Sequence, residues 1–304
     1  MKKFSIVIPT YNRAALLEEL LHSMITQKFN PDFFEFLIID NNSTDNTAEV
    51  IDKFNTAYSK FDIRYFKEPR QGVQYAWNKG IDEAKGSLLV FIDDDASFHK
   101  DYFEDLEKNF SNNTDSVVGG GKVAPVFEIQ KPAWIYKYIM PYFVEINLGR
   151  KSKFPKSKHP FAANMLISKN VFDKIGKFST DKNNNKSVIL PGTFEKDLFK
   201  RIRKENIPIY YFHDLVVWHF IPQEKINKAY IKDQAIEIGK LHREIHSEKG
   251  FLYSFFAFWK VIAKWLISVV LATYYIFTTQ WEKAIMLYKV LWWRTRGFLG
   301  FYKS

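Results

Sequence analysis

The stretch LLVFIDDDA, which runs from Leu88 to Ala96, places three consecutive aspartates directly after a short apolar run. Leu88–Ile92 has the length and composition of a buried strand. Because side chains alternate along an extended chain, the carboxylates of Asp93 and Asp95 point the same way. Such a pair suits a hard cation, Mg²⁺ or Mn²⁺, that takes oxygen ligands and keeps positions open for phosphate oxygens. The alternative is a solvated acidic turn that caps the next helix, and the strand before it favours the functional interpretation.

The order of strand and helix repeats on both sides of this stretch. Apolar runs predict further strands at Phe4–Ile8, Phe36–Ile39 and Ile63–Phe66. Helical spacing and capping residues predict helices at Ala14–Gln27, Asp45–Phe54, Gly72–Ala84 and Asp101–Phe110. This alternation with short connections is typical of an α/β fold with a mostly parallel, doubly wound central sheet flanked by helices.

Polar clusters follow three of these strands. Ligands bind such sheets at the carboxyl ends of the strands. Thr10-Tyr11-Asn12, Asp40-Asn41-Asn42 and Asp93-Asp94-Asp95 all fall at strand ends. Three separate strand ends therefore predict one site. After Val117 the pattern is mixed, with strands expected at Phe161–Ser168, Ile209–Phe212 and Val216–Trp218, helices at Lys169–Ile175 and Thr193–Glu205, and a polar loop at Lys182–Lys186.

Composition narrows the class of protein. The 304 residues suit one large domain or about two, and the hydrophobic fraction of 46% argues against disorder. The absence of cysteine excludes disulfides, thiolate metal sites and a cysteine nucleophile. The apolar run Phe4–Pro9 is too short for a signal peptide, so we expect no secretion.

The C-terminal region is basic and aromatic. The formal net charge is +10, and most of it falls after Gln223. We expect a charged helix at Lys225–His246 and apolar helices at Phe251–Phe277 and Trp281–Trp293. The uninterrupted part, Trp265–Phe277, is 13 residues long, whereas a bilayer span needs about 20. We therefore expect these helices to lie in a membrane interface, with one transmembrane helix at about 255–277, or a soluble helix pair, as the alternatives.

Four motifs together resemble family 2 glycosyltransferases, which have the GT-A fold. They are FSIVIPTYNR, LIIDNNSTDNT, EPRQGVQYAWNKGIDEAKGSLLVFIDDDA and FAANMLISKNVFDKIGKF, in that order. The resemblance implies a catalytic domain at 1–222, with a nucleotide-binding half at about 1–115 and an acceptor half at about 116–222. A helical region that associates with membranes would follow at 223–304. It also implies sugar transfer from a nucleotide diphosphate sugar with inversion.

The resemblance implies roles for individual residues. Asp40 would bind the base, typically uracil, and Arg70 would lie along the nucleotide. Asp93 would contact the ribose or the water shell of the metal, and Asp95 would bind the metal directly. His219 would contact the metal or the diphosphate, although a buried core histidine is as good an interpretation. The nucleotide pocket would be completed by Pro9, Thr10, Tyr11 and Asn12, and Asp94 would adjoin it, more as a structural residue.

The catalytic base is where the sequence departs from the family. An acidic pair normally stands at the start of a helix, and here Phe194 takes the place of one acid. Aligning the helix puts Glu195 at the position of the catalytic aspartate and Asp197 at the second acidic position. A carboxylate is needed there to take the proton from the acceptor hydroxyl. Glu195 is favoured, and two helix N-terminal acids without catalytic work are the alternative.

These features predict a hexosyl- or N-acetylhexosaminyl-transferase with Mn²⁺ or Mg²⁺ as cofactor. The donor is expected to be a UDP-sugar, and the acceptor a glycan or lipid-linked molecule of surface polysaccharide assembly at the cytoplasmic face of the membrane. Donor selectivity is expected to depend on the segments Gly119–Pro125 and Phe161–Asn164. A sugar nucleotidyltransferase would need a glycine-rich loop after the first strand. A non-catalytic carbohydrate-binding or membrane-scaffold protein remains an alternative, and nucleic-acid binding is disfavoured because no groove-reading motif is present.

Overall fold

The computed structural model describes residues 2–110, 114–180, 193–248 and 251–301. The polar loop expected at Lys182–Lys186 lies outside these ranges. The chain divides into two compact units. The first unit holds the chain up to Val126 and the part from Val144 to Phe220, and the second holds Phe127–Phe143 and the chain from Ile221 onward. The stretch Phe127–Phe143 thus belongs with the C-terminal helices, a feature that the expected domain boundaries do not contain.

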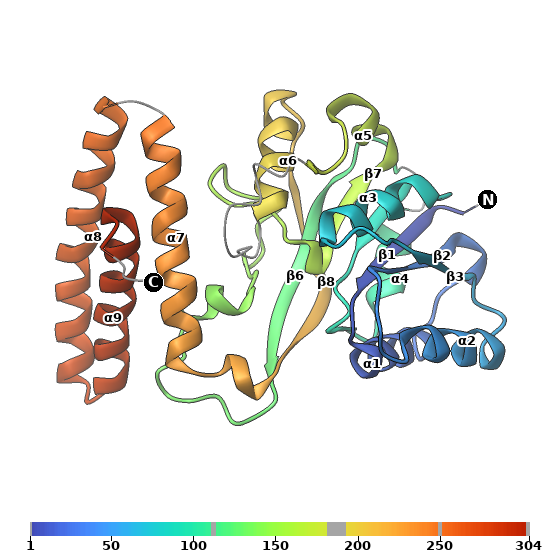
Figure 1. Cartoon of the computed structure of the whole chain (residues 1–304), viewed down its shortest axis with the longest axis horizontal. Helices are drawn as coiled ribbons and strands as arrows, with labels where there is room; N and C mark the ends of the chain where they lie inside the picture. Colours follow the sequence, from blue (N-terminus) through green and yellow to red (C-terminus); the bar gives the residue numbers. More distant parts are fainter. Residues whose placement is uncertain (1, 111–113, 181–192, 249–250, 302–304) are drawn as a thin grey trace. The chain divides into compact units, whose positions relative to one another are not determined.

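The described strands form one eight-stranded sheet in the order β3-β2-β1-β4-β7-β6-β8-β5 (Figure 1). Its parallel half confirms the predicted arrangement and consists of β1 (Phe4–Thr10), β2 (Phe34–Asp40), β3 (Ile63–Lys67) and β4 (Leu88–Phe91). The other half brings in antiparallel pairs. There β7 (Met165–Ser168) pairs with β4 and with β6 (Val118–Phe127), and β5 (Ala96–Phe98) pairs with β8 (Tyr210–Ile221).

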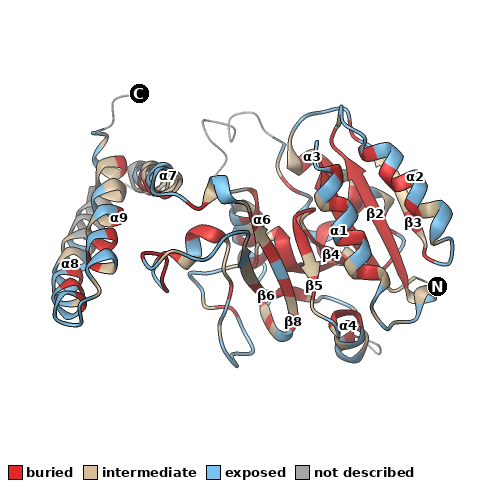
Figure 2. Ribbon diagram, turned by 90° about the horizontal axis from the view of Figure 1, so that it is seen from below, coloured by how far each residue is buried: buried red, intermediate tan, exposed pale blue. Residues whose placement is uncertain are grey.

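Hydrophobic cores lie on both faces of the sheet, as the buried strands in Figure 2 indicate. Val7 of β1 faces one core and its neighbours Ile6 and Ile8 face the other, because side chains alternate along a strand. The first core is completed by α3 (Val73–Glu83), α5 (Lys169–Ile175) and α6 (Thr193–Lys204). The second is completed by α1 (Ala14–Ile25), α2 (Thr47–Ala57) and α4 (Tyr102–Phe110).

Three details of the second half of the sheet differ from the expectation. The predicted strand Phe161–Ser168 begins with a 3₁₀ turn at Ala162–Asn164 before β7 starts. The two short strands expected near Ile209 and Val216 are one continuous strand, β8, across the exposed pair His213-Asp214. The short edge strand β5 was not expected at all, and it is the strand that connects the aspartates to β8.

The glycines of the run Gly119–Gly121 lie inside β6, where they allow close packing. A Cβ atom on Gly121 would lie 2.1 Å from the carbonyl oxygen of Leu215, and one on Gly119 would lie 2.5 Å from that of Tyr210. Both oxygens belong to β8. Only glycine therefore allows the backbones of β6 and β8 to approach this closely.

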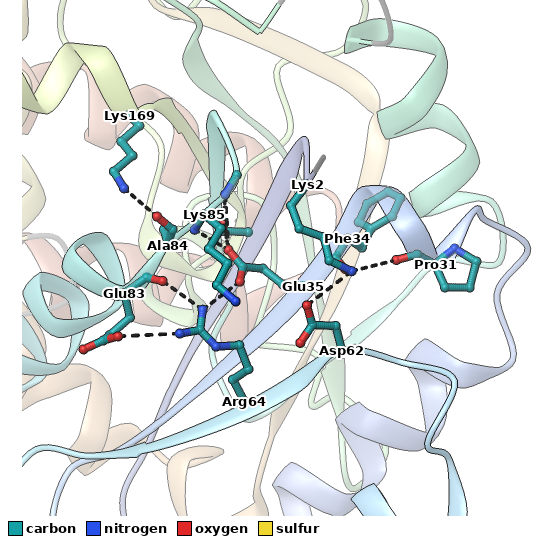
Figure 3. A network of polar contacts seen from close by, with 12 residues as sticks. Lys2, Pro31, Phe34, Glu35, Asp62, Arg64, Glu83, Ala84, Lys85 and Lys169 are labelled. Carbon is teal, nitrogen blue, oxygen red and sulfur yellow. Dashed lines mark hydrogen bonds and ion pairs between the residues drawn. The ribbon is translucent and has the colours of Figure 1, made fainter.

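A buried carboxylate connects the strands at the end of the sheet away from the aspartates (Figure 3). Glu35 of β2 is fully buried and accepts hydrogen bonds from the Ser5 hydroxyl at 2.6 Å and from Arg64 at 2.8 Å. It also accepts from the backbone nitrogens of Lys85 and Gly86, which precede β4. Burial alone would raise the pKa of Glu35, but these hydrogen bonds outweigh it and hold the pKa below the ordinary glutamate value.

The second unit packs α7 (Lys228–Glu248), α8 (Phe251–Phe277) and α9 (Trp281–Leu299) with Phe127–Phe143 around a core of its own. The helices α7 and α9 cross closely at two glycines, since a Cβ on Gly239 would lie 2.9 Å from the Cα of Gly297. None of the described helices is both long enough and apolar enough to span a membrane.

Candidate functional site

The acidic triplet and a histidine from β8 form a cluster with metal-binding geometry. The antiparallel pairing of β5 and β8 places His219 opposite Ala96, next to the triplet. The His219 Nε2 atom lies 3.2 Å from Asp95 Oδ1. One ligand atom from each of Asp93, Asp95 and His219 falls within 4.8 Å of the others. Two carboxylates and an imidazole are a donor set that suits Mn²⁺, so the residues present fit the expected metal.

Asp94 has a structural place in the triplet. Its Oδ2 atom accepts a hydrogen bond of 2.9 Å from the Thr10 hydroxyl, and its Oδ1 atom lies 2.9 Å from the guanidinium of Arg13. The same Arg13 nitrogen lies 3.2 Å from Asp95 Oδ2. Arg13 therefore neutralises two buried carboxylates and fixes the orientation of Asp95, whose other oxygen faces His219.

The pKa values of the triplet reflect crowded, buried charge. Burial and then the charge of Asp95 raise the pKa of Asp93 to about 7, although the nearby His219 lowers it. Burial is also the largest cause of the raised pKa of Asp94, and the Arg13 cation opposes it. Carboxylates in this state favour a bound cation.

The loops after β1 and β2 are tied together by hydrogen bonds. Asn12 adopts a left-handed backbone with φ of 51°. Its backbone nitrogen donates to the Ser43 hydroxyl at 3.0 Å, and its side-chain oxygen accepts from the Thr44 nitrogen at 2.7 Å. Of the other residues expected in the nucleotide pocket, Pro9 and Thr10 are buried in β1, whereas Tyr11 is 46% exposed. Asn12 and Tyr11 thus stand at the carboxyl end of the sheet, where the nucleotide was expected.

Asp40 ends β2 and is almost fully buried. Its Oδ1 atom accepts a hydrogen bond of 2.7 Å from the Ser43 nitrogen, and its Oδ2 atom accepts one of 2.5 Å from the Tyr65 hydroxyl. Burial, then the hydrogen bond to Asp40, raises the pKa of Tyr65. Both oxygens of Asp40 therefore have protein partners. A contact with the nucleobase of the donor would use a remaining lone pair. The role of Asp40 in base binding stays a prediction.

Arg70 belongs to a loop that Asn41 organises. The side-chain nitrogen of Asn41 donates to the carbonyl oxygens of Glu68 and Arg70, and its side-chain oxygen accepts from the Gly72 nitrogen. The Arg70 guanidinium makes a two-pronged contact with Glu68 at 2.7 and 2.9 Å, and its side chain is 66% exposed. The pairing with Glu68 does not exclude the expected contact with a nucleotide, because the exposed guanidinium has further donors.

The two candidate bases have different surroundings. Glu195 is 4% exposed, and its Oε1 atom accepts a hydrogen bond of 3.2 Å from the Ala162 nitrogen. Burial raises the pKa of Glu195, and its charge contributes to the raised pKa of Asp93. Asp197 instead forms an ion pair with Arg201 one turn later, with an Oδ2–Nε distance of 3.0 Å. Arg201 also donates to the carbonyl oxygens of Gly176 and Lys177, so Asp197 helps to hold α6 against the end of α5.

A hollow of about 230 Å³ opens beside Asp95. Its wall includes Trp218 and Phe220 of β8 and Glu19 of α1. Ligand pockets commonly measure roughly 300–1,000 Å³, so this hollow is too small to hold a nucleotide sugar by itself. It accommodates at most a part of a ligand next to the metal-binding cluster.

Arg13 and Asn41 are the residues whose part in the site the sequence did not assign. Both stand inside the quoted motifs, next to residues that were assigned. Arg13 directly follows the strand-end cluster Thr10-Tyr11-Asn12. Because three adjacent aspartates stand elsewhere in the chain and buried carboxylates need a partner, a cation at this position could have been read as that partner. Asn41 stands in the predicted cluster Asp40-Asn41-Asn42, but no local signal gives its role, since its partners Glu68 and Arg70 are distant in sequence.

Comparison with known proteins agrees with this geometry. The model of glycosyl transferase family 2 matches residues 5–176, more than half of the chain. Glycosyltransferase AglE of Haloferax volcanii is 34% identical over 116 residues, which are 38% of each chain. The glucosyl-dolichyl phosphate glucuronosyltransferase of the same organism is 25% identical over 183 residues, 59% of this chain and 56% of that protein. The match thus spans well under two thirds of the length of these relatives.

The fold has a counterpart among solved structures. The mannosyltransferase PcManGT of Pyrobaculum calidifontis, solved in complex with GDP-Man and Mn²⁺, superposes with a TM-score of 0.62. The superposition covers 98% of this chain and 87% of that one, at 16% sequence identity. At this identity the likeness concerns the fold alone, and it confirms the expected GT-A architecture.

Proposed function

Because this chain belongs to glycosyl transferase family 2, we propose that it transfers a sugar from a nucleotide diphosphate sugar to a hydroxyl group, with inversion at the anomeric carbon. One observation carries the proposal. The metal-binding cluster Asp93–Asp95–His219 at the strand ends lies close enough to the buried Glu195 of α6 for the two to interact electrostatically. A leaving diphosphate needs a site for cations, and an attacking hydroxyl needs a base.

Within this proposal Asp93, Asp95 and His219 hold a divalent ion, for which Mn²⁺ is the best candidate. When bound, such an ion would supply positive charge that stabilises the leaving diphosphate. Arg13 keeps Asp95 oriented through its contact of 3.2 Å, and Asp94 keeps Arg13 in place. The donor nucleotide lies over the loops of Tyr11, Asp40 and Arg70, as the family resemblance implies.

Glu195 is the base that we assign to the acceptor. Burial raises the pKa of Glu195, which brings its basicity closer to that needed near neutral pH. The Ala162 nitrogen holds one oxygen, and the carboxylate can accept the acceptor's proton on the other. Asp197 is engaged by Arg201 on its own helix and serves as a positioning residue for α6.

The acceptor that we propose is a glycan carried on a lipid, in hexosyl or N-acetylhexosaminyl transfer for surface polysaccharide assembly. The named activity of the Haloferax volcanii relative, on glucosyl-dolichyl phosphate, supports a lipid-linked acceptor. We further propose that the donor is a UDP-sugar. Because the Pyrobaculum calidifontis protein was solved in complex with GDP-Man, a GDP-sugar is the first alternative donor to test.

The proposed site of action is the cytoplasmic face of a membrane. Exposed apolar side chains support this, since α8 exposes Leu266, Val270, Tyr274 and Phe277 at helical spacing. On α9 the exposed residues Trp281, Ile285, Trp292 and Leu299 lie on one face in the same way. Exposed apolar stripes with tryptophans suit the interface between lipid and water.

The enzymatic proposal is tested by a donor screen. UDP- and GDP-sugars are incubated with the full chain and Mn²⁺, and release of the nucleoside diphosphate is measured. We expect release from at least one donor, its loss on chelation of the metal, and its loss in Asp95→Asn. A full chain that binds Mn²⁺ but releases nothing from any donor, with or without glycan acceptors, would contradict the proposal and favour a carbohydrate-binding protein.

The membrane proposal is tested by flotation with lipid vesicles. The variant Val270→Asp/Phe277→Asp/Ile285→Asp places three charges on the apolar stripes and should lose vesicle binding. The control Ile129→Asp/Tyr138→Asp changes exposed apolar residues elsewhere in the same unit and should bind as the wild type does. Equal binding of the stripe variant and the wild type would show that another surface holds the membrane.

A further inference from the structure

A cluster of cations lies on the acceptor side of the first unit. The loop 147–160 contains five lysines and arginines and no acidic residue. The side chains of Lys151, Lys153, Lys156 and Lys158 are exposed, and α6 adds Lys196 and Arg203. We call these six residues the basic patch. A run of cations is often only a solvated surface, so its structure and its position decide whether it has a function.

The loop that carries the patch is held in a defined conformation. The Phe154 nitrogen donates to the Ile209 carbonyl at 2.9 Å, and the Tyr211 nitrogen donates to the Ser152 carbonyl at 3.0 Å. Phe154 itself is buried in the core. Lys153 stands over the ring of Tyr210, with its Nζ atom 5.5 Å from the ring centroid. The loop thus runs along the start of β8, and these backbone hydrogen bonds hold the main chain that carries its lysines.

The same loop is fastened to α6, the helix of the proposed base. Arg203 donates a hydrogen bond to the Lys158 carbonyl. The ring of His159 stacks on that of Phe199, with centroids 5.2 Å apart. Burial lowers the pKa of His159, and the cations of Arg203 and Lys196 lower it further. Loop and helix cations therefore lie near one another around His159, whose protonated form the helix cations disfavour.

The patch stands close to Glu195. The Ala162 nitrogen binds the Glu195 carboxylate at 3.2 Å. Ala162 is four positions after Lys158, and a fully extended chain of four residues spans at most about 14 Å. Lys196 directly follows Glu195 in α6. A molecule whose hydroxyl lies at Glu195 therefore has the patch within reach of its neighbouring groups.

The lysines of the loop have no carboxylate partner among the described residues. None of Lys151, Lys153, Lys156 and Lys158 forms an ion pair with a carboxylate in the described part of the chain. Grouped like charges repel one another unless an anion lies between them. Lysine ammonium groups bind phosphate well as point charges. The arrangement is suited to an anion that carries more than one charge.

We propose that the basic patch binds the diphosphate ester of a lipid-linked acceptor while the acceptor hydroxyl lies at Glu195. The inference rests on the proposed glycosyl transfer and gives the acceptor a chemical class, a prenyl diphosphate glycan. Phosphate groups of a bilayer offer similar chemistry, and the experiment must distinguish the two sources.

The test measures binding of farnesyl diphosphate to the full chain, with EDTA present so that no divalent metal contributes. We expect the wild type to bind farnesyl diphosphate and not farnesol, with an affinity that falls as salt is added. The variant Lys153→Gln/Lys156→Gln/Lys158→Gln should bind at least tenfold more weakly. The control Lys28→Gln/Lys53→Gln/Lys60→Gln removes the same charge from exposed sites on other elements and should bind as the wild type does.

Equal binding of farnesyl diphosphate by the patch variant and the wild type would overturn the proposal. If that variant also lost binding to phosphatidylglycerol vesicles relative to phosphatidylcholine vesicles, the patch would be assigned to the bilayer instead. Donor cleavage with Mn²⁺ is measured on the same proteins. If the wild type cleaves no donor, the proposed function fails, whereas the binding result still decides the role of the patch.

Discussion

Replacing Glu195 by glutamine separates the two candidate bases. The substitution keeps the shape of the side chain and an oxygen that can accept the hydrogen bond from the Ala162 nitrogen, which lies 3.2 Å away. It removes only the ability to take a proton. The matched variant is Asp197→Asn, which keeps an oxygen for Arg201 and removes one exposed charge from the same helix.

The expected magnitudes differ widely. General-base catalysis contributes about 10²–10⁴ in rate, which corresponds to about 3–5 kcal/mol in the activation barrier. We therefore expect Glu195→Gln to lose at least a hundredfold in turnover. Asp197 takes part in a surface pair spaced four residues apart, and such pairs contribute about 0.3–0.5 kcal/mol. Asp197→Asn should change turnover by no more than about twofold, through a small shift of α6.

The assay is nucleoside diphosphate release from the donor that the wild type uses, with Mn²⁺ saturating. Thermal unfolding of each variant provides the control for folding. Because burial raises the folded-state pKa of Glu195, its ionisation is less favourable in the folded than in the unfolded chain. Removing that ionisation should leave the free energy of unfolding at neutral pH unchanged or higher. Lost activity in a fully stable protein is the expected combination for Glu195→Gln.

The pH profile adds a second readout. The apparent pKa of the acidic limb of kcat/KM should lie above the ordinary glutamate pKa of 4.5, because the base must be ionised to accept a proton. The reasoning would be refuted if Asp197→Asn lost a hundredfold while Glu195→Gln stayed active. It would also fail if Glu195→Gln unfolded, since its loss of turnover would then reflect structure.

Three further predictions concern the metal-binding cluster and the sheet. Asp95→Asn should weaken Mn²⁺ binding at least tenfold, as measured by electron paramagnetic resonance, because even partners outside the ligand set alter affinity by about 10–100-fold; unchanged affinity would remove Asp95 from the ligand set. Arg13→Met leaves Asp94 and Asp95 without their cation, so it should lower the free energy of unfolding by about 1–3 kcal/mol. Mn²⁺ should raise the melting temperature of this variant more than that of the wild type, and an equal rise would contradict the neutralising role. Glu35→Gln should lower the free energy of unfolding at pH 7 by about 3 kcal/mol. The pKa of Glu35 is lowered on folding, so its contribution is present above 4.5 and is lost as pH falls through the folded value. When denaturant unfolding is measured from pH 7 to pH 3, the difference in free energy of unfolding between variant and wild type should therefore shrink as the pH falls.

The first half of the fold was predictable because its signals are local. Each parallel strand is a short apolar run followed by a polar cluster, and the aspartates after Ile92 mark the ligand edge of the sheet without reference to distant residues. The edge strand Ala96–Phe98 was missed because it has only three residues and its partner, β8, comes more than a hundred residues later. Pairing at that distance leaves no trace in a local pattern.

The candidate site shows the same limit. The carboxylates and His219 were predicted from motifs, and the structure brings Asp93, Asp95 and His219 together. The sequence alone favours Glu195 only by alignment, because the burial of its side chain and the contacts of Arg201 with the end of α5 are not local features. The exposed pair His213-Asp214 likewise obscured the continuity of β8.

The hydrogen bonds that join Asn12 to Ser43 and Thr44 have a thermodynamic consequence for binding of the nucleotide-sugar donor. Both partners of each bond belong to the protein, so we expect the two loops to lose their conformational entropy when the chain folds. Donor binding would then order little further backbone, and its measured entropy should be less unfavourable than that of a protein whose loops close on the ligand. Discrimination among the nucleobases of different donors would follow from the fixed shape of the pocket. Asn12→Gly should therefore weaken the binding of all donors through an entropic cost, while their order of preference stays the same.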